Sequence, residues 1–133
     1  MANGHTDGDS IVFFSRENVM HMGDHLFAGG FPFVDISSGG NVFGFISNLE
    51  QILARVDDQT LIVPGHGPAV MSKAELAAYR DMLVTTSNRV KEALAKGESV
   101  EQITERGLGD EFDSYGKGFI NEKAWIGFIA ASL

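Results

Sequence analysis

The feature that most constrains the fold is a long amphipathic segment over residues 72–96. Ser72 followed by Glu75 matches the capping-box pattern that opens helices, and Gly97 supplies a stop. Between them, apolar residues recur at the spacing of one helix face: Leu76, Tyr79, Leu83, Val90 and Leu94. Because a helix of this length needs a second layer on which to bury its apolar stripe, the sequence predicts a layered fold with this helix outermost.

Short β-rich runs are the candidates for the second layer. Residues 11–14 and 18–22 flank a polar turn of hairpin length, and residues 60–63 form an apolar run that stops at Pro64, as a buried strand does. Further helices are expected over residues 42–56, over residues 99–107 and from Asn121 onward. The order predicts an α/β (α+β) fold, a mixed sheet with helices packed on it, and residues 1–133 fit a single domain.

Charge and composition exclude several classes of function. The chain has 18 acidic and 10 basic residues, and its formal net charge of −8 repels nucleic-acid phosphates. No apolar run approaches the roughly 20 residues that cross a bilayer, and the polar start lacks the regions of a signal peptide. We therefore expect no nucleic acid, no membrane and, as the chain is written, a cytoplasmic protein. Because cysteine is absent, any metal has to be held by His and carboxylate groups.

The predicted sheet has too few strands to bury both of its faces. In a chain with 10 Phe, such a sheet leaves an apolar face or an open edge that needs covering. Association of two copies by two-fold symmetry is the simplest cover, and we expect a homodimer.

Three residues in glycine-flanked turns are the candidates for chemistry. They are His5 in Gly-His-Thr-Asp-Gly-Asp-Ser, Asp24 in Met-Gly-Asp-His-Leu-Phe and His66 in Pro-Gly-His-Gly-Pro. Neighbouring glycines let the backbone turn sharply and present a side chain to an ion without crowding it. Taken alone, each is more simply interpreted as a surface or hydrogen-bonded histidine, or as a turn-forming aspartate. His25 is a further candidate ligand, whereas His21 alternates with methionines and is interpreted as a residue of a sheet face.

Taken together and in this order, the three motifs resemble the second half of the metallo-β-lactamase superfamily. The resemblance also covers the Phe-Pro-Phe-Val-Asp loop and the terminal helices. It implies one half of a four-layer αβ/βα sandwich, with one or two zinc ions. By resemblance, His5 completes a first zinc site, Asp24 is the catalytic carboxylate that bridges two metals, and His66 completes the second site. A bridging carboxylate is similar to the glyoxalase II and lactonase type of member.

The His-x-His-x-Asp-His motif that supplies most metal ligands in this family does not occur in the chain. The chain is therefore expected to correspond to the C-terminal half of such a hydrolase and to work with a second copy or a complementary N-terminal half. The implied reaction is hydrolysis of a small-molecule ester, lactone, thioester or β-lactam. The alternative is a catalytically inert, self-associating half-fold fragment without metal chemistry. Members of this family are often periplasmic, so the resemblance leaves the cellular compartment of the chain open.

Two further groups have open interpretations. Asp7 and Asp9 shape the turn after His5, and either could orient the His5 ring. The aromatic residues Phe27, Phe31 and Phe33 either line a substrate pocket or pack beneath their loop.

Overall fold

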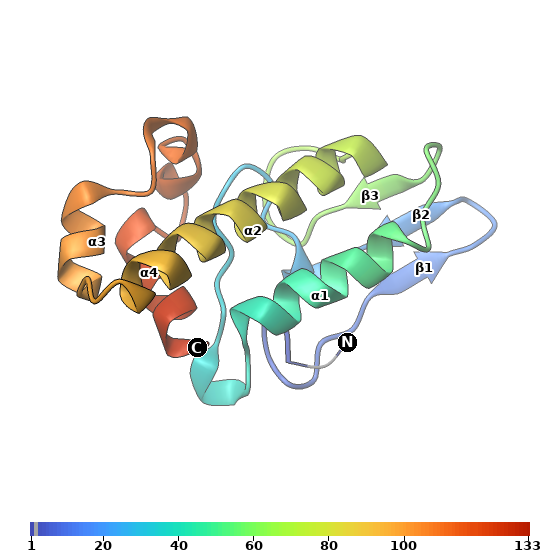
Figure 1. Cartoon of the computed structure of the whole chain (residues 1–133). Coiled ribbons are helices and arrows are strands. Elements are labelled where there is room, and N and C mark those ends of the chain that lie inside the picture. Colours follow the sequence, from blue (N-terminus) through green and yellow to red (C-terminus); the bar gives the residue numbers. More distant parts are fainter. Residues whose placement is uncertain (2) are drawn as a thin grey trace.

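The computed structural model describes Met1 and residues 3–133. Its strands and α-helices in this part of the chain are, in order, β1 (Val12–Phe14), β2 (Val19–His21), α1 (Val42–Leu53), β3 (Leu61–Val63), α2 (Lys73–Ala95), α3 (Val100–Arg106) and α4 (Glu122–Ala131) (Figure 1). Four short 3-10 helices join them: η1 (Gly23–His25), η2 (Ile36–Ser38), η3 (Asp110–Phe112) and η4 (Tyr115–Lys117). The predicted fold class, a mixed sheet with helices packed on it, is confirmed.

The sheet has the order β1-β2-β3, with β1 antiparallel and β3 parallel to β2. Its middle row joins Phe13, Met20 and Ile62, and the last two are almost fully buried. Successive side chains point to opposite faces, so the flanking rows face the other way. That face, here called the open sheet face, carries the half-exposed side chains of Val12, Phe14 and Leu61.

The helices cover the other side of the sheet. The helix α2 packs against α1, β3, α3 and α4, and Figure 1 shows it running from the strands to the α3–α4 end of the molecule. Met20 and Ile62 join α1 and α2 in one hydrophobic core, which includes Phe45, Leu49 and Leu76. Within the described residues, no helix is both long and apolar enough to cross a membrane.

The predicted helix boundaries follow side-chain caps. Ser72 and Ser99 each form a complete capping box, and the side chain of Asn121 accepts a hydrogen bond from Ala124 N. The first helix, α1, ends at Leu53 and is shorter than the predicted 42–56. Asp57 instead belongs to the turn before β3, where its carboxylate accepts hydrogen bonds from the Asn18 side chain and the Gln59 backbone, both at 2.9 Å.

Candidate functional site

The ends of the two parallel strands deliver two of the three candidate residues. The chain leaves β2 into η1, which carries Asp24, and leaves β3 into the turn that carries His66. Met22 N donates to Val63 O at 2.9 Å, and Gly65 N donates to Gly23 O at 3.0 Å, so the two turns stay side by side. Parallel strands end at the same edge of a sheet, which places both residues there.

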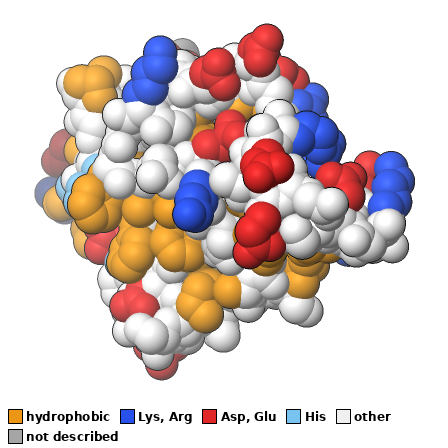
Figure 2. All heavy atoms as spheres, turned by 90° about the vertical axis from the view of Figure 1, so that its left-hand side faces the viewer, with side chains coloured by type: hydrophobic (Ala, Val, Ile, Leu, Met, Phe, Trp, Pro, Cys, Tyr) orange, Lys and Arg blue, Asp and Glu red, His pale blue; other side chains and the backbone are white. Residues whose placement is uncertain are grey.

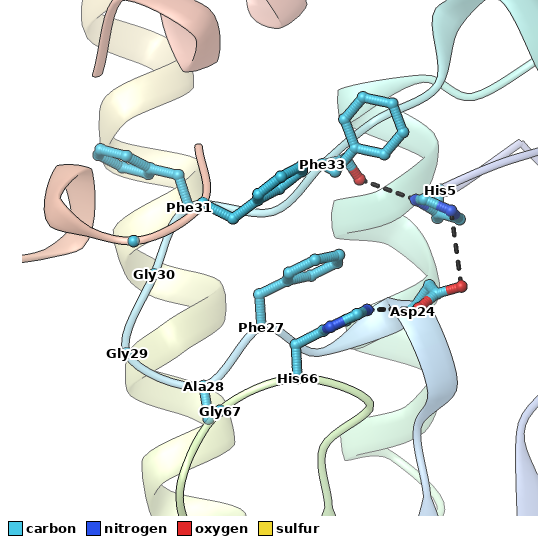
Figure 3. Close-up of a pocket in the computed structure, with 12 residues that line it drawn as sticks. His5, Asp24, Phe27, Ala28, Gly29, Gly30, Phe31, Phe33, His66 and Gly67 are labelled. Carbon is cyan, nitrogen blue, oxygen red and sulfur yellow. Dashed lines mark hydrogen bonds and ion pairs between the residues drawn. The ribbon is translucent and has the colours of Figure 1, made fainter. Parts of the chain in front are cut away.

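His5 reaches the same place from the N-terminal segment. Two backbone hydrogen bonds tie this segment to the loop after Phe33: Asp35 N donates to His5 O, and Asn41 N donates to Gly4 O, both at 2.9 Å. A Cβ on Gly40 would collide with the His5 carbonyl, so the close approach requires glycine there. The structure thereby brings His5, Asp24 and His66 together (Figure 3).

The two histidines flank the carboxylate of Asp24. His66 Nε2 lies 2.8 Å from Asp24 Oδ1, and His5 Nε2 lies 3.6 Å from Asp24 Oδ2. Each oxygen of the carboxylate thus faces a different histidine. The His5 side chain is mostly buried, whereas those of Asp24 and His66 are about half exposed.

Hydrogen bonding and stacking fix the two imidazole rings. His5 Nδ1 lies 2.9 Å from the carbonyl oxygen of Phe33, and because a carbonyl only accepts, Nδ1 carries the proton. In the neutral form of the ring, the lone pair is therefore on Nε2, the atom that faces Asp24. The ring of His66 stacks on Phe27, with centroids 4.3 Å apart and an interplanar angle of 12°. Both rings are held before any ligand arrives.

The spacing of the donor atoms of His5, Asp24 and His66 decides whether these residues fit a zinc ion. Two ligands about 2.1 Å from one tetrahedral ion lie about 3.4 Å apart, which is close to the 3.6 Å between His5 Nε2 and Asp24 Oδ2. The 2.8 Å contact of His66 is instead a hydrogen bond, which an ion would have to replace. Within the described residues, no group of three or more His, Cys, Asp or Glu is arranged to hold a metal ion. Of the two histidines, only His5 is therefore spaced from Asp24 as two ligands of one ion are.

The remaining candidates lie outside the site. His25 is fully buried, stacks on Phe45, and its Nε2 accepts from Asn48 at 2.9 Å, so it does not serve as an extra ligand at Asp24. Burial lowers the pKa of His25, against a smaller opposing effect of Asp9, whose carboxylate lies 3.7 Å from its Nδ1.

Of the open interpretations of Asp7 and Asp9, the structure supports turn formation, and neither residue is the partner that orients His5. The Asp9 carboxylate accepts hydrogen bonds from Thr6 N and Thr6 Oγ1, and Asp7 contributes a backbone hydrogen bond to Ser38 O. The carbonyl of Phe33 orients the ring of His5 instead. A backbone oxygen has no signature in a sequence, which is why this partner was missed.

A pocket of about 600 Å³ adjoins the three residues. Phe27, Phe31 and Phe33 line it and are also packed against their surroundings, so packing beneath the loop is confirmed and a role in binding substrate stays a prediction. Figure 3 shows Phe27 between the His5–Asp24 pair and the Gly29–Gly30 turn. Phe119 also lines the pocket and was missed by the sequence analysis; its one signal is the short Gly-Lys-Gly-Phe segment in which it lies.

Replacing Gly65 with alanine tests the junction of the two turns. A Cβ at this position would collide with the Gly23 carbonyl, directly beside Asp24. We expect Gly65→Ala to lower the free energy of unfolding by about 1–3 kcal/mol, as overpacking does. Urea unfolding measures the loss. The control is Gly8→Ala, where an added Cβ meets nothing within 4 Å; equal stabilities of the two variants would contradict the proposed junction.

The comparisons with known proteins identify the fold. No protein-family model matches the sequence, and no curated protein is significantly similar to it. Among solved structures, a double mutant of the sec-alkyl sulfatase PisA1 has a TM-score of 0.75 at 15% identity, over 96% of this chain and 22% of the sulfatase. VMB-1 has a TM-score of 0.52 at 20% identity, over 63% of this chain and 38% of VMB-1. A metallo-β-lactamase from Pontibacter korlensis has a TM-score of 0.49 at 18% identity, over 62% of this chain and 38% of that protein.

These neighbours are hydrolases of the metallo-β-lactamase fold. At identities of 15% and 20%, the likeness shows the fold alone, and the chain has part of that fold. It spans about a fifth of the sulfatase and under two fifths of VMB-1. The family of these neighbours uses a metal cofactor.

Proposed function

We propose that the chain contributes His5, Asp24 and His66 to the metal site of a hydrolase, with zinc as the metal. The observation that carries the proposal is the Asp24 carboxylate, which points one oxygen to the Nε2 atom of each histidine. When bound to these residues, zinc would supply an activated water and stabilisation of the negative charge that develops on the attacked substrate. Lactone, ester, thioester and β-lactam bonds share this reaction class.

Each residue of the chain has a defined part in this proposal. Asp24 is the catalytic carboxylate, and its negative charge lies between the two donor atoms. His5 presents a lone pair because the Phe33 carbonyl holds the ring proton on the opposite nitrogen. To become a ligand, His66 would have to give up the Nε2 proton that it donates to Asp24.

The pairing of donors on either side of Asp24 also indicates that further ligands complete the site. Two donors on each side are fewer than the three protein ligands of an ordinary catalytic zinc site. We propose that residues 1–133 are equivalent to the C-terminal half of a metallo-β-lactamase-fold hydrolase. A second copy or a complementary N-terminal half then supplies the remaining ligands.

A panel of esters tests the proposed activity. The chain is stripped with a chelator, reloaded with zinc and given a p-nitrophenyl ester, a thioester, a lactone and a β-lactam. We expect at least one to be hydrolysed above the buffer rate, with loss of the rate in His66→Ala and retention in Asp58→Asn, which changes an exposed carboxylate outside the site. Failure of every substrate would overturn the hydrolase proposal for the chain alone and for its homodimer.

The second candidate is a catalytically inert, self-associating half-fold. The observation that favours it is that no group of three metal-binding side chains is preformed in the described part of the chain. Under this alternative, the chain binds no zinc and hydrolyses none of the panel, yet still associates.

The open sheet face supports the proposal of self-association. Val12 and Phe14 of β1 and Leu61 of β3 are each about half exposed on it, on either side of β2, whereas a soluble monomer rarely leaves such a group uncovered. In the isolated chain, a second copy covers this face by two-fold symmetry.

We expect sedimentation to show a dimer that Phe14→Glu converts to a monomer, because the added carboxylate would be buried without a partner. The matched control is Val70→Glu, which alters an equally exposed apolar residue outside the sheet and leaves the dimer intact. A wild-type chain that stays monomeric at every concentration would rule out the second copy. Binding of a separate N-terminal half by such a monomer would assign the face to that half.

A further inference from the structure

The buried ring of His25 lies where the segments that carry His5 and Asp24 meet. His25 follows Asp24 directly in η1, and its side chain has no exposed surface. Its backbone N donates to Met22 O at 3.1 Å, so the turn that carries Asp24 lies between two buried side chains. Because buried polar groups are generally hydrogen-bonded, the partners of this ring indicate what it holds in place.

One edge of the ring contacts α1 and the residue before His5. The side-chain amide nitrogen of Asn48 lies 2.9 Å from His25 Nε2, and because an amide nitrogen only donates, Nε2 accepts. A Cβ added to Gly4 would collide with the same Nε2 atom and with the Asn48 amide. The backbone of Gly4 therefore packs directly on the His25–Asn48 pair.

The opposite edge of the ring faces Asp9. Since Nε2 accepts, the ring proton lies on Nδ1, which is buried and forms no hydrogen bond within the described residues. The carboxylate of Asp9 lies 3.7 Å from Nδ1, too far for a hydrogen bond but close enough to attract the N–H group. Asp9 in turn accepts from Thr6 N and Thr6 Oγ1, at 3.0 and 2.6 Å. Residues 4–9, which include His5, are therefore folded around this imidazole.

The helix α1 fixes the orientation of the ring. Phe45 stacks on it, with centroids 5.0 Å apart and an interplanar angle of 17°. Phe45 and Asn48 both lie on α1 and are both buried. Stacking on Phe45 sets the plane of the imidazole, and the hydrogen bond from Asn48 sets its rotation within that plane.

We propose that His25 is a positioning residue that sets the spacing between His5 and Asp24. It acts on Asp24 through the backbone of η1, and on His5 through the contacts of its ring with Gly4 and Asp9. The spacing concerned is the 3.6 Å between His5 Nε2 and Asp24 Oδ2, which suits two ligands of one ion. The consequence for a metal rests on the proposed function, whereas the positioning is a property of the chain itself.

Amide hydrogen exchange on the metal-free chain tests the positioning. The amides of Asp35 and Asn41 donate to the carbonyls of His5 and Gly4, so their exchange rates report how firmly residues 4 and 5 are held. His25→Leu keeps an apolar side chain in the core but removes both ring nitrogens. We expect it to raise the exchange rates of these two amides about tenfold or more.

Ile103→Ala is the control for a general loss of stability. Ile103 is buried in α3, at the other end of the molecule from the strands (Figure 1), the end that faces the viewer in Figure 2. This variant is destabilised by a cavity, yet we expect it to leave the exchange of the Asp35 and Asn41 amides unchanged. Equal increases in Ile103→Ala and His25→Leu, or no increase in His25→Leu, would overturn the proposal.

His25→Gln is the conservative variant. Its side-chain oxygen can accept from Asn48, but the aromatic ring and Nδ1 are lost. We expect exchange rates of the Asp35 and Asn41 amides between those of the parent chain and those of His25→Leu. Should His25→Leu not fold, the same two amides decide the question in His25→Gln, where exchange as slow as in the parent would overturn the proposal.

Zinc affinity tests the consequence for the site and separates this proposal from the proposed function. We expect calorimetric titration to show zinc binding about 10–100-fold weaker in His25→Leu than in the parent, as is typical when a residue that orients ligands is lost, and unchanged in Ile103→Ala. Faster amide exchange in His25→Leu with no zinc binding by the parent would support the positioning and count against the metal site. Equal zinc affinity of the parent and His25→Leu would support the metal site and overturn the role of His25 in its spacing.

Discussion

Replacing Asp24 with asparagine is expected to weaken zinc binding by about 100-fold, or roughly 2.7 kcal/mol, while the chain stays folded. The amide keeps the shape of the carboxylate but removes the charge that lies between His5 and His66. Because half of the Asp24 side chain is exposed, the substitution creates no buried unpaired group. Calorimetric titration with zinc measures the affinity, and thermal unfolding checks the fold.

The matched control is Asp58→Asn, which removes the same charge from an exposed position outside the site. If the general negative charge of the chain attracted the ion, both variants would lose affinity to a similar, small extent. A large loss in Asp24→Asn alone is the expected pattern. Equal affinities of the two variants would contradict the assignment of Asp24.

The largest effect on stability is expected for Trp125→Ala, at about 3–5 kcal/mol. Trp125 is fully buried where α4 meets α2, and its Nε1 donates to Thr86 Oγ1 at 2.9 Å. Its ring also stacks on Phe31, with centroids 5.6 Å apart, and Phe31 lines the pocket. The substitution therefore opens a cavity, leaves the Thr86 hydroxyl without this donor and removes support from the pocket wall. Urea unfolding measures the difference.

Trp125→Phe separates the contribution of aromatic packing from that of the indole hydrogen bond. It keeps an aromatic ring against Phe31 but loses the indole donor and some volume, so we expect a smaller loss of about 1–3 kcal/mol. A loss below about 1 kcal/mol for Trp125→Ala would contradict the placement of this residue in the core, because cavities of that size cost more.

Local signals in the sequence predicted the helices well. The capping boxes at Ser72 and Ser99 and the cap at Asn121 involve residues within one helical turn, so a single sequence contains the whole interaction. The end of α1 was less predictable because Asp57 is drawn into a turn by Asn18, which lies 39 positions earlier. Contacts of such long range do not follow from a local pattern.

The candidate site was likewise predictable where local sequence patterns determine it and unpredictable where long-range contacts do. The glycine-flanked turns correctly predicted that His5, Asp24 and His66 lie in turns or at the ends of elements, with Asp24 in the short 3-10 helix η1, and the structure brings the three together. Their role as metal ligands stays a prediction. The adjacency of His25 to Asp24 in the sequence was misleading: the 3-10 turn η1 directs His25 into the core against Phe45 while Asp24 lines the pocket. The position of Phe119 at the pocket depends on its contact with Phe33, which is far away in the sequence, and the short Gly-Lys-Gly-Phe segment is a weak signal for it.

The amount of zinc bound per chain tests the central claim most directly. The chain is stripped with a chelator, reloaded with zinc, washed and analysed by mass spectrometry, in parallel with His5→Ala, Asp24→Ala and His66→Ala. We predict that the parent chain retains zinc and that each of the three variants loses it. Equal zinc in the parent and all three variants, or none in the parent, would contradict a metal site built on Asp24 and its two histidines.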